Sequence, residues 1–155
     1  MVIWDSLAIA EHLAEVFPGL WPADQASRAK ARSVSAEMHS SFVAMRDALP
    51  MNVRKSSPET ETWRAPGAEK DIARVCEIWA ECRAAVPTGG GPFLFGEFSI
   101  ADAMFAPVCM RFITYAPPMD DLSRAYVAAV AAMPEMQEWI AAAHEESHRI
   151  EQYEK

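Results

Sequence analysis

The feature that most constrains this chain is the start of one helix, in the segment Gly96–Asp102 with the sequence GEFSIAD. A serine just before a helix can accept a hydrogen bond from the N–H of the third helical residue. An acidic residue at that third position can accept one from the N–H of the serine in return. The following residues, 103–115, are apolar on nearly every side, which is typical of a helix inside a bundle. Water cannot reach the first turn of such a helix, so we predict that Ser99 and Asp102 form an internal capping box.

The rest of the chain carries helical periodicity and almost no strand pattern. The predicted helices cover, in order, residues 6–16, 25–50, 72–86, 103–115, 123–132 and 134–149. One face of the second helix carries Val34, Met38, Phe42, Met45 and Leu49. Pro107 lies inside the central helix, where it removes one backbone hydrogen bond and should kink the helix. The sequence therefore predicts an all-α bundle.

Composition excludes several classes of partner. A formal net charge of −8 argues against nucleic acid and anionic membrane surfaces. No stretch approaches the ~20 apolar residues of a membrane span, and the start carries no signal-peptide pattern. The 3 cysteines are odd in number and lie at apolar helical positions, which suits reduced thiols. We therefore expect a cytoplasmic protein without nucleic-acid or membrane partners.

The capping segment, with its glycine, its Phe98 and the apolar helix after it, resembles the central motif of the C-terminal helical domain of the glutathione S-transferase family. Residues 4–13, with the sequence WDSLAIAEHL, are similar to the end of that family's N-terminal thioredoxin-like domain. Residues 20–22 (LWP) are similar to its interdomain linker, and residues 133–140 (MPEMQEWI) to its final helix. The resemblance covers essentially the whole chain.

The resemblance implies two parts. Residues 1–19 would be a remnant of the thioredoxin-like, glutathione-binding domain, and residues 20–155 the C-terminal helical domain. The expected fold is thus an all-α bundle of the glutathione S-transferase C-terminal type, preceded by one remnant helix. The chain begins where the glutathione-binding domain should be ending, so we expect it to be N-terminally truncated.

Asp5 and Ser6 begin the first predicted helix. Free N–H groups and the positive end of the helix dipole favour an anion there, and the serine hydroxyl adds a donor. A neighbouring aspartate offers a partner for an ammonium, so the pair could hold the amino-acid end of a γ-glutamyl group. The resemblance implies this role, with glutathione as cosubstrate. The alternative is that either residue merely caps the helix, where Asp and Ser are preferred.

The family's thiolate-stabilising residue and its glutathione-binding proline loop lie in the missing part of the N-terminal domain. No catalytic residue is therefore assigned in this chain. The resemblance implies a homodimeric transferase that conjugates glutathione to a small apolar electrophile, active only with its complete N-terminal domain. Isomerisation and peroxide reduction remain open as reaction types.

The family's second substrate packs near the first bundle helices, so Met38, Phe42 and Arg46 are candidates for the rim of an electrophile pocket. The nearby segment Met51–Arg54 belongs to the same region. Apolar side chains beside an arginine suit an apolar electrophile or an anionic tail. The alternative is two core residues and a solvated arginine.

Two further functions remain as alternatives. Residues His144–His148 match the H-E-x-x-H pattern of zinc hydrolases, in which two histidines on one helical face bind zinc beside a general base. The match lies in a polar terminal helix with few residues after it to supply a third ligand, so we expect a solvated helix and no metal site. The other alternative is a stand-alone, non-catalytic helical interaction module that covers its exposed apolar face by dimerisation.

Overall fold

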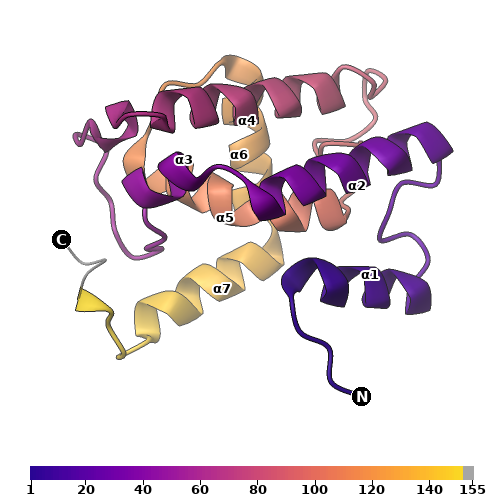
Figure 1. Ribbon diagram of the computed structural model, residues 1–155, viewed down its shortest axis with the longest axis horizontal. Coiled ribbons are helices and arrows are strands. Elements are labelled where there is room, and N and C mark those ends of the chain that lie inside the picture. The colour runs from indigo at the N-terminus through magenta and orange to yellow at the C-terminus, as the bar shows by residue number, and fades with distance from the viewer. Residues whose placement is uncertain (152–155) are drawn as a thin grey trace. The chain divides into compact units, whose positions relative to one another are not determined.

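The computed structural model describes residues 1–151 (Figure 1). Its elements along the chain are α1 (Ser6–Val16), α2 (Gln25–Ser40), α3 (Val43–Ala48), the 3-10 helix η1 (Thr62–Arg64), α4 (Ala68–Arg83), α5 (Ile100–Tyr115), α6 (Asp121–Ala131) and α7 (Pro134–Glu145). Outside the helices, two isolated bridges pair residues within 93–97. The prediction of an all-α protein is confirmed.

The helices form two compact units. The first contains Met1–Ser41 and Ile78–Phe105, and the second contains Phe42–Glu77 and the chain from Ala106 onward. Helices α4 and α5 each contribute residues to both units. Among residues 1–151, no helix has the length and apolar character needed to cross a lipid bilayer.

In the first unit, α1 runs beside α2 (Figure 1). Lys30 on α2 forms an ion pair with Glu81 on α4. The rings of Trp79 and Phe105 meet edge to face, with centroids 6.0 Å apart, inside the unit's apolar core. Other buried apolar residues of this unit are Trp21, Ala31, Val34, Met38, Ile78, Cys82, Leu94, Ile100 and Ala101.

The start of α5 is built around the buried carboxylate of Asp102. Its Oδ2 accepts hydrogen bonds from the Ser99 N–H at 2.9 Å and from the Ser99 hydroxyl at 3.1 Å. Its Oδ1 accepts a third from the N–H of Leu94 at 3.0 Å. The Ile100 N–H donates to the carbonyl of Leu20 at 2.9 Å, so the start of α5 is also tied to the segment between α1 and α2.

The predicted helix over residues 25–50 is in fact two helices, so that prediction is wrong. Helix α2 ends at Ser40, and Phe42 adopts the left-handed conformation, with φ 65° and ψ 38°. Helix α3 then starts at Val43, and the N–H of Met45 in its first turn donates to the Asp71 carboxylate on α4 at 3.0 Å. This distant acceptor satisfies an N–H that a new helix start leaves without an intrahelical partner. Phe42 and Met45 are both buried, as the apolar spacing predicted.

In the second unit, side chains of α5 form hydrogen bonds with the long segment between α3 and η1. The Arg111 guanidinium donates to the carbonyls of Leu49 at 2.8 Å and Pro107 at 3.2 Å. The Thr114 hydroxyl donates to the carbonyl of Asn52 at 3.2 Å, and the Tyr115 hydroxyl to that of Pro50 at 3.1 Å. These contacts fix the position of residues 49–54, which line a pocket described below.

Candidate functional site

Asp5 immediately precedes α1 and caps the first turn of this helix. Its Oδ1 accepts hydrogen bonds from the N–H groups of Leu7 at 3.0 Å and Ala8 at 3.2 Å. Its backbone lies at φ 79°, a region that few residues other than glycine occupy and that aspartate tolerates better than most. Asp5 therefore caps α1, which is one of the two roles considered for it. Ser6 is exposed beside it.

Asp5 also has a partner on α2. Its Oδ2 lies 3.0 Å from Nε2 of His39, and both side chains are partly exposed. The hydrogen bond from the Ala8 N–H lowers the pKa of Asp5, and the Leu7 N–H and His39 lower it further. A carboxylate held ionised beside an exposed serine hydroxyl and a helix N-terminus can pair with an ammonium while its neighbours bind a carboxylate. This cluster of Asp5, Ser6 and His39 is the candidate binding site of the first unit.

Of the three residues predicted as an electrophile-pocket rim, Met38 lies in the C-terminal half of α2, Phe42 immediately before α3 and Arg46 within α3. Met38 and Phe42 are 2% and 5% exposed, and Arg46 is half-buried. Met38 belongs to the first unit, whereas Phe42 and Arg46 belong to the second. Their place in a substrate rim stays a prediction.

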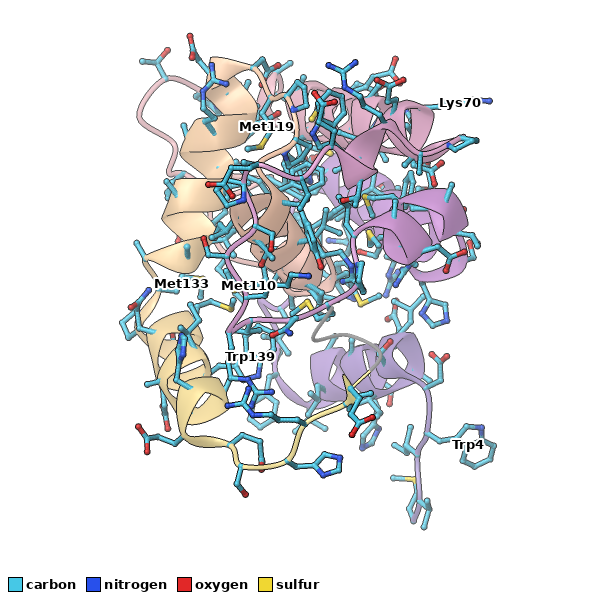
Figure 2. All side chains as sticks on the ribbon, turned by 90° about the vertical axis from the view of Figure 1, so that its left-hand side faces the viewer. Trp4, Lys70, Met110, Met119, Met133 and Trp139 are labelled. Carbon is cyan, nitrogen blue, oxygen red and sulfur yellow. The ribbon has the colours of Figure 1, made fainter. Side chains whose placement is uncertain are left out.

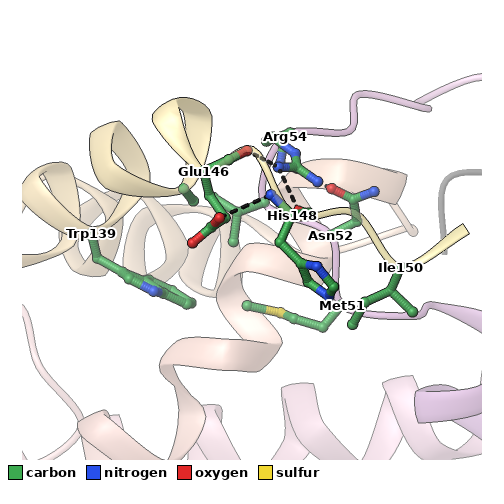
Figure 3. Close-up of a pocket in the computed structure, with 9 residues that line it drawn as sticks. Met51, Asn52, Arg54, Trp139, Glu146, His148 and Ile150 are labelled. Atoms are coloured by element: carbon green, nitrogen blue, oxygen red, sulfur yellow. Dashed lines mark hydrogen bonds between the residues drawn. The ribbon is translucent and has the colours of Figure 1, made fainter.

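The second unit contains a pocket of about 260 Å³ between the segment after α3 and the end of α7 (Figure 3). Its lining residues are Met51, Asn52, Val53, Arg54, Trp139, Ala143, Glu146, His148 and Ile150. The Arg54 guanidinium donates through Nη1 to the carbonyls of Glu146 at 2.8 Å and His148 at 3.5 Å. The sequence pointed to residues 51–54, but nothing in it indicated that the C-terminal segment lies against them.

The H-E-x-x-H pattern of residues 144–148 does not lie on one helix, as zinc binding by both histidines would require. The last helix was predicted to reach about residue 149, but α7 ends at Glu145 and Glu146 is already extended, at ψ 120°. His144 and His148 therefore do not share a helical face, and they line different pockets. In the part of the chain that the structure describes, no three His, Cys, Asp or Glu side chains gather into a possible metal site.

Helix α1 carries an exposed apolar face made of Ile9, Leu13 and Val16, which Phe17 extends immediately after the helix. Trp4 precedes it, is 79% exposed, and projects from the N-terminal segment away from the helices (Figure 2). Single exposed apolar side chains are ordinary, but a continuous face of this kind usually marks a surface that another element covers.

Sequence reasoning missed His39 as a partner of Asp5. The two residues are far apart in the chain, and only the packing of α1 against α2 brings them together. It also missed Trp139 and Ile150 as pocket residues, because they lie against residues 51–54, which are far away in the sequence. For these three residues the sequence carried no signal.

Comparisons with known proteins found one family match and a similar solved structure. Residues 34–142 match the family described as glutathione S-transferase, C-terminal domain. The chain is also similar to the crystal structure of a glutathione transferase homologue from Burkholderia gl BGR1 with bound glutathione. That match has a TM-score of 0.65 and 23% identity, and covers 93% of this chain and 68% of the other. No curated protein matches the sequence.

Proposed function

Since the chain belongs to the family of glutathione S-transferase C-terminal domains, we propose that it forms part of a transferase that conjugates glutathione to a small apolar electrophile. The solved homologue contains bound glutathione, which supports glutathione as the ligand. In this proposal, residues 1–19 are the last part of a thioredoxin-like domain, and residues 20–155 form the C-terminal helical domain. The protein acts in the cytoplasm as a homodimer.

The observation that carries the proposal is the exposed start of α1. The γ-glutamyl end of glutathione has one ammonium and one carboxylate. The ammonium would pair with Oδ2 of Asp5, where Nε2 of His39 lies in the free protein. The carboxylate would accept hydrogen bonds from the Ser6 hydroxyl at the positive end of the helix dipole.

The group that holds the glutathione sulfur as a thiolate would come from the thioredoxin-like domain and not from this chain. The helical domain would supply the apolar surface for the electrophile, with Met38, Phe42 and Arg46 at its rim. We therefore expect the 155-residue chain alone to bind glutathione weakly and to have no transferase activity.

Calorimetric titration of glutathione into the protein as its native cell makes it tests the binding role. Ser6→Ala and Asp5→Asn each remove one charge-assisted hydrogen bond, so each should weaken binding about tenfold or more. Ser33→Ala is the matched control, because Ser33 is an exposed helical serine on α2 whose hydroxyl donates to the carbonyl of Ala29. Equal affinities for wild type and Ser6→Ala would overturn the binding role.

The mass of the native protein tests the domain assignment. A mass well above 17.2 kDa, with peptides that precede Met1, and conjugation of an activated aryl chloride by that longer protein would support the proposal. Transferase activity in the 155-residue chain by itself would overturn the statement that the thiolate-stabilising group lies elsewhere.

The exposed apolar face of α1 favours a second candidate function, a non-catalytic interaction module that dimerises through this face. Light scattering would then show a dimer of the 155-residue chain, and Leu13→Glu should dissociate it. Ile113→Glu, at an exposed apolar position of the second unit, should leave the dimer intact. A monomer that binds no second copy would remove this candidate.

A further inference from the structure

We propose that a pocket between α1 and α2 binds a small zwitterion whose ammonium and carboxylate lie about 6 Å apart, as in an unblocked dipeptide. The pocket is lined by residues of α1, of α2 and of the segment that joins them (Figure 1). All of these residues belong to the first unit. Its volume of about 490 Å³ lies within the roughly 300–1,000 Å³ typical of small-molecule sites. The proposal does not depend on glutathione binding or transferase activity.

The two helices bring opposite charges to the pocket. Helix α1 contributes the carboxylates of Glu11 and Glu15, and α2 contributes the guanidinium groups of Arg28 and Arg32. Their formal charges cancel, so a simple anion or cation would be attracted by one helix and repelled by the other. A ligand that carries both charges can match both helices, which favours a zwitterion.

The acidic side of the pocket retains acceptors for an ammonium. Oε2 of Glu11 accepts hydrogen bonds from Nε1 of Trp21 at 3.3 Å and from Nη2 of Arg32 at 3.2 Å. Within residues 1–151, Oε1 of Glu11 accepts none. Glu15 lies one turn later on the same face, with its side chain 78% exposed and 3.5 Å from Nδ1 of His12. An ammonium can therefore bind between the two carboxylates.

The basic side of the pocket retains donors for a carboxylate. Nη1 of Arg28 donates to the carbonyls of Pro22 at 3.0 Å and Ala23 at 2.7 Å, which fixes the guanidinium against the segment before α2. In the part of the chain that the structure describes, its Nε and Nη2 donate no hydrogen bond. These two groups form a planar fork that matches the two oxygens of a carboxylate. The neighbouring carboxylate of Asp24 already accepts a hydrogen bond from the Ser27 N–H, at 2.8 Å.

The spacing of these groups favours charges that are well separated. Arg28 and Arg32 are four residues apart on α2, a rise of about 6 Å along the helix. Glu11 contacts Arg32, whereas Arg28 extends toward the carbonyls before α2. The amine nitrogen and the terminal carboxyl carbon of a dipeptide are about 6 Å apart, compared with about 2.5 Å in a single amino acid. A dipeptide, or an ω-amino acid of equal length, can therefore contact both Glu11 and Arg28.

The apolar lining of the pocket is held in place. The Trp21 side chain is 6% exposed, and the Arg32 guanidinium lies over its ring, 5.7 Å from the centroid. Pro18 and Pro22, whose rings have little conformational freedom, line the same pocket. Binding a ligand here requires little ordering of the protein, which preserves affinity.

The pocket lies on the side of α1 opposite to its exposed apolar face. Glu11, Ala14 and Glu15 line the pocket and are spaced as neighbours on one helical face. Successive helical residues are turned by about 100°, so Leu13 and Val16 point to the other side. A further element or a second copy that covers the apolar face does not have to block the pocket.

The test is a nuclear magnetic resonance titration of the full protein with alanylalanine, compared with its N-acetyl and C-terminal amide derivatives. Each derivative has lost one of the two charges. We expect alanylalanine to give saturable shifts at the Trp21 indole N–H and the Ala14 amide, and each derivative to bind at least about fivefold more weakly. Equal affinities for the three ligands would overturn the zwitterion assignment. Shifts at the Leu7 and Ala8 amides without any at Trp21 would place the ligand at the start of α1 and overturn the site.

Two further ligands separate the charge spacing from the peptide group. 5-Aminopentanoate carries its charges about 6 Å apart without a peptide bond, and free alanine carries them about 2.5 Å apart. Binding of 5-aminopentanoate as tight as that of alanylalanine would support selection by charge spacing alone. Weaker but saturable binding of 5-aminopentanoate would support a peptide as the ligand. Free alanine bound as tightly as alanylalanine would overturn the assigned spacing.

Two variants assign each charge of the ligand to one side of the pocket. Glu11→Gln keeps an acceptor for the Trp21 N–H but removes the negative charge, so it should weaken alanylalanine binding about fivefold and leave the N-acetyl derivative unaffected. Arg28→Gln should weaken alanylalanine binding by a similar factor and leave the amide derivative unaffected.

Arg74→Gln is the control, because it removes a guanidinium from α4 in the second unit, and it should change none of these affinities. Wild-type affinity for alanylalanine in both Glu11→Gln and Arg28→Gln would overturn the site. An equal loss for alanylalanine and for the derivative that lacks the matching charge would overturn the assigned contacts.

Discussion

The buried carboxylate of Asp102 accepts a hydrogen bond from the N–H of Leu94, eight residues earlier in the chain, at 3.0 Å. The same carboxylate binds the N–H of Ser99 through its other oxygen. One side chain therefore caps the start of α5 and also holds the turn that leads into it. Neither backbone group lies where water could take over as the acceptor.

Asp102→Ala should lower the free energy of unfolding by at least about 2 kcal/mol, because two buried N–H groups would lose their acceptor. Asp121→Ala is the control, since the Asp121 side chain is 98% exposed in the first turn of α6, and should change stability by less than about 0.5 kcal/mol. Urea denaturation of the two variants measures both. A loss in Asp102→Ala as small as that of the control would contradict the account of this carboxylate.

Gly96 lies where the chain turns before α5, at φ 92°, and a Cβ there would overlap the carbonyl oxygen of Gly90. Gly89 has a similar φ of 80°, but a Cβ on it would meet nothing within 4 Å. Both substitutions should lower the free energy of unfolding, because alanine is disfavoured in the left-handed conformation. Gly96→Ala should lower it by a further ~1–3 kcal/mol, because its Cβ would overlap the backbone. Equal unfolding free energies for Gly96→Ala and Gly89→Ala would show that the turn relaxes freely.

Ala116 follows the last residue of α5 in the left-handed conformation, at φ 45°, with its N–H donating to the carbonyl of Phe112. Glycine is favoured at such a position, but a glycine also makes the unfolded chain more flexible, which opposes folding. The net effect of Ala116→Gly should be a stabilisation of about 0.5 kcal/mol. Ala125→Gly makes the same change at an exposed site within α6 and should cost about 1 kcal/mol. Thermal unfolding should show shifts of opposite sign, and a destabilised Ala116→Gly would contradict the prediction.

Hydrogen bonds from Ala8 and Leu7 lower the pKa of Asp5 below its ordinary value of 3.8. The lowered pKa means that the folded protein binds the proton less readily than the unfolded chain. The capping contribution of Asp5 is therefore complete above pH 3.8 and is lost as the pH falls through the lower folded value. The amide resonances of Leu7 and Ala8 should shift with a midpoint below pH 3.8, and Asp5→Asn should remove that transition. A midpoint at or above 3.8 would contradict the assigned hydrogen bonds.

The limits of sequence reasoning are clearest at the junction of α2 and α3. The apolar spacing correctly predicted that Phe42 and Met45 are buried, but it predicted one continuous helix through them. Periodicity records which side chains face a core, and a break that keeps both residues buried leaves that pattern nearly unchanged. Asp71, which binds the first turn of α3, is supplied by another helix and leaves no local signal.

The sequence by itself determined the all-α class, the family and the local chemistry at helix starts. Asp5 accepts hydrogen bonds from the N–H groups of Leu7 and Ala8, within three residues of it, so short-range preferences were enough to place this cap. Only the tertiary structure decided that His39 meets Asp5, and that Arg54 binds the segment after α7. These contacts join residues 34 or more positions apart. Such pairs are chosen by the packing of whole helices, which no short stretch of sequence records.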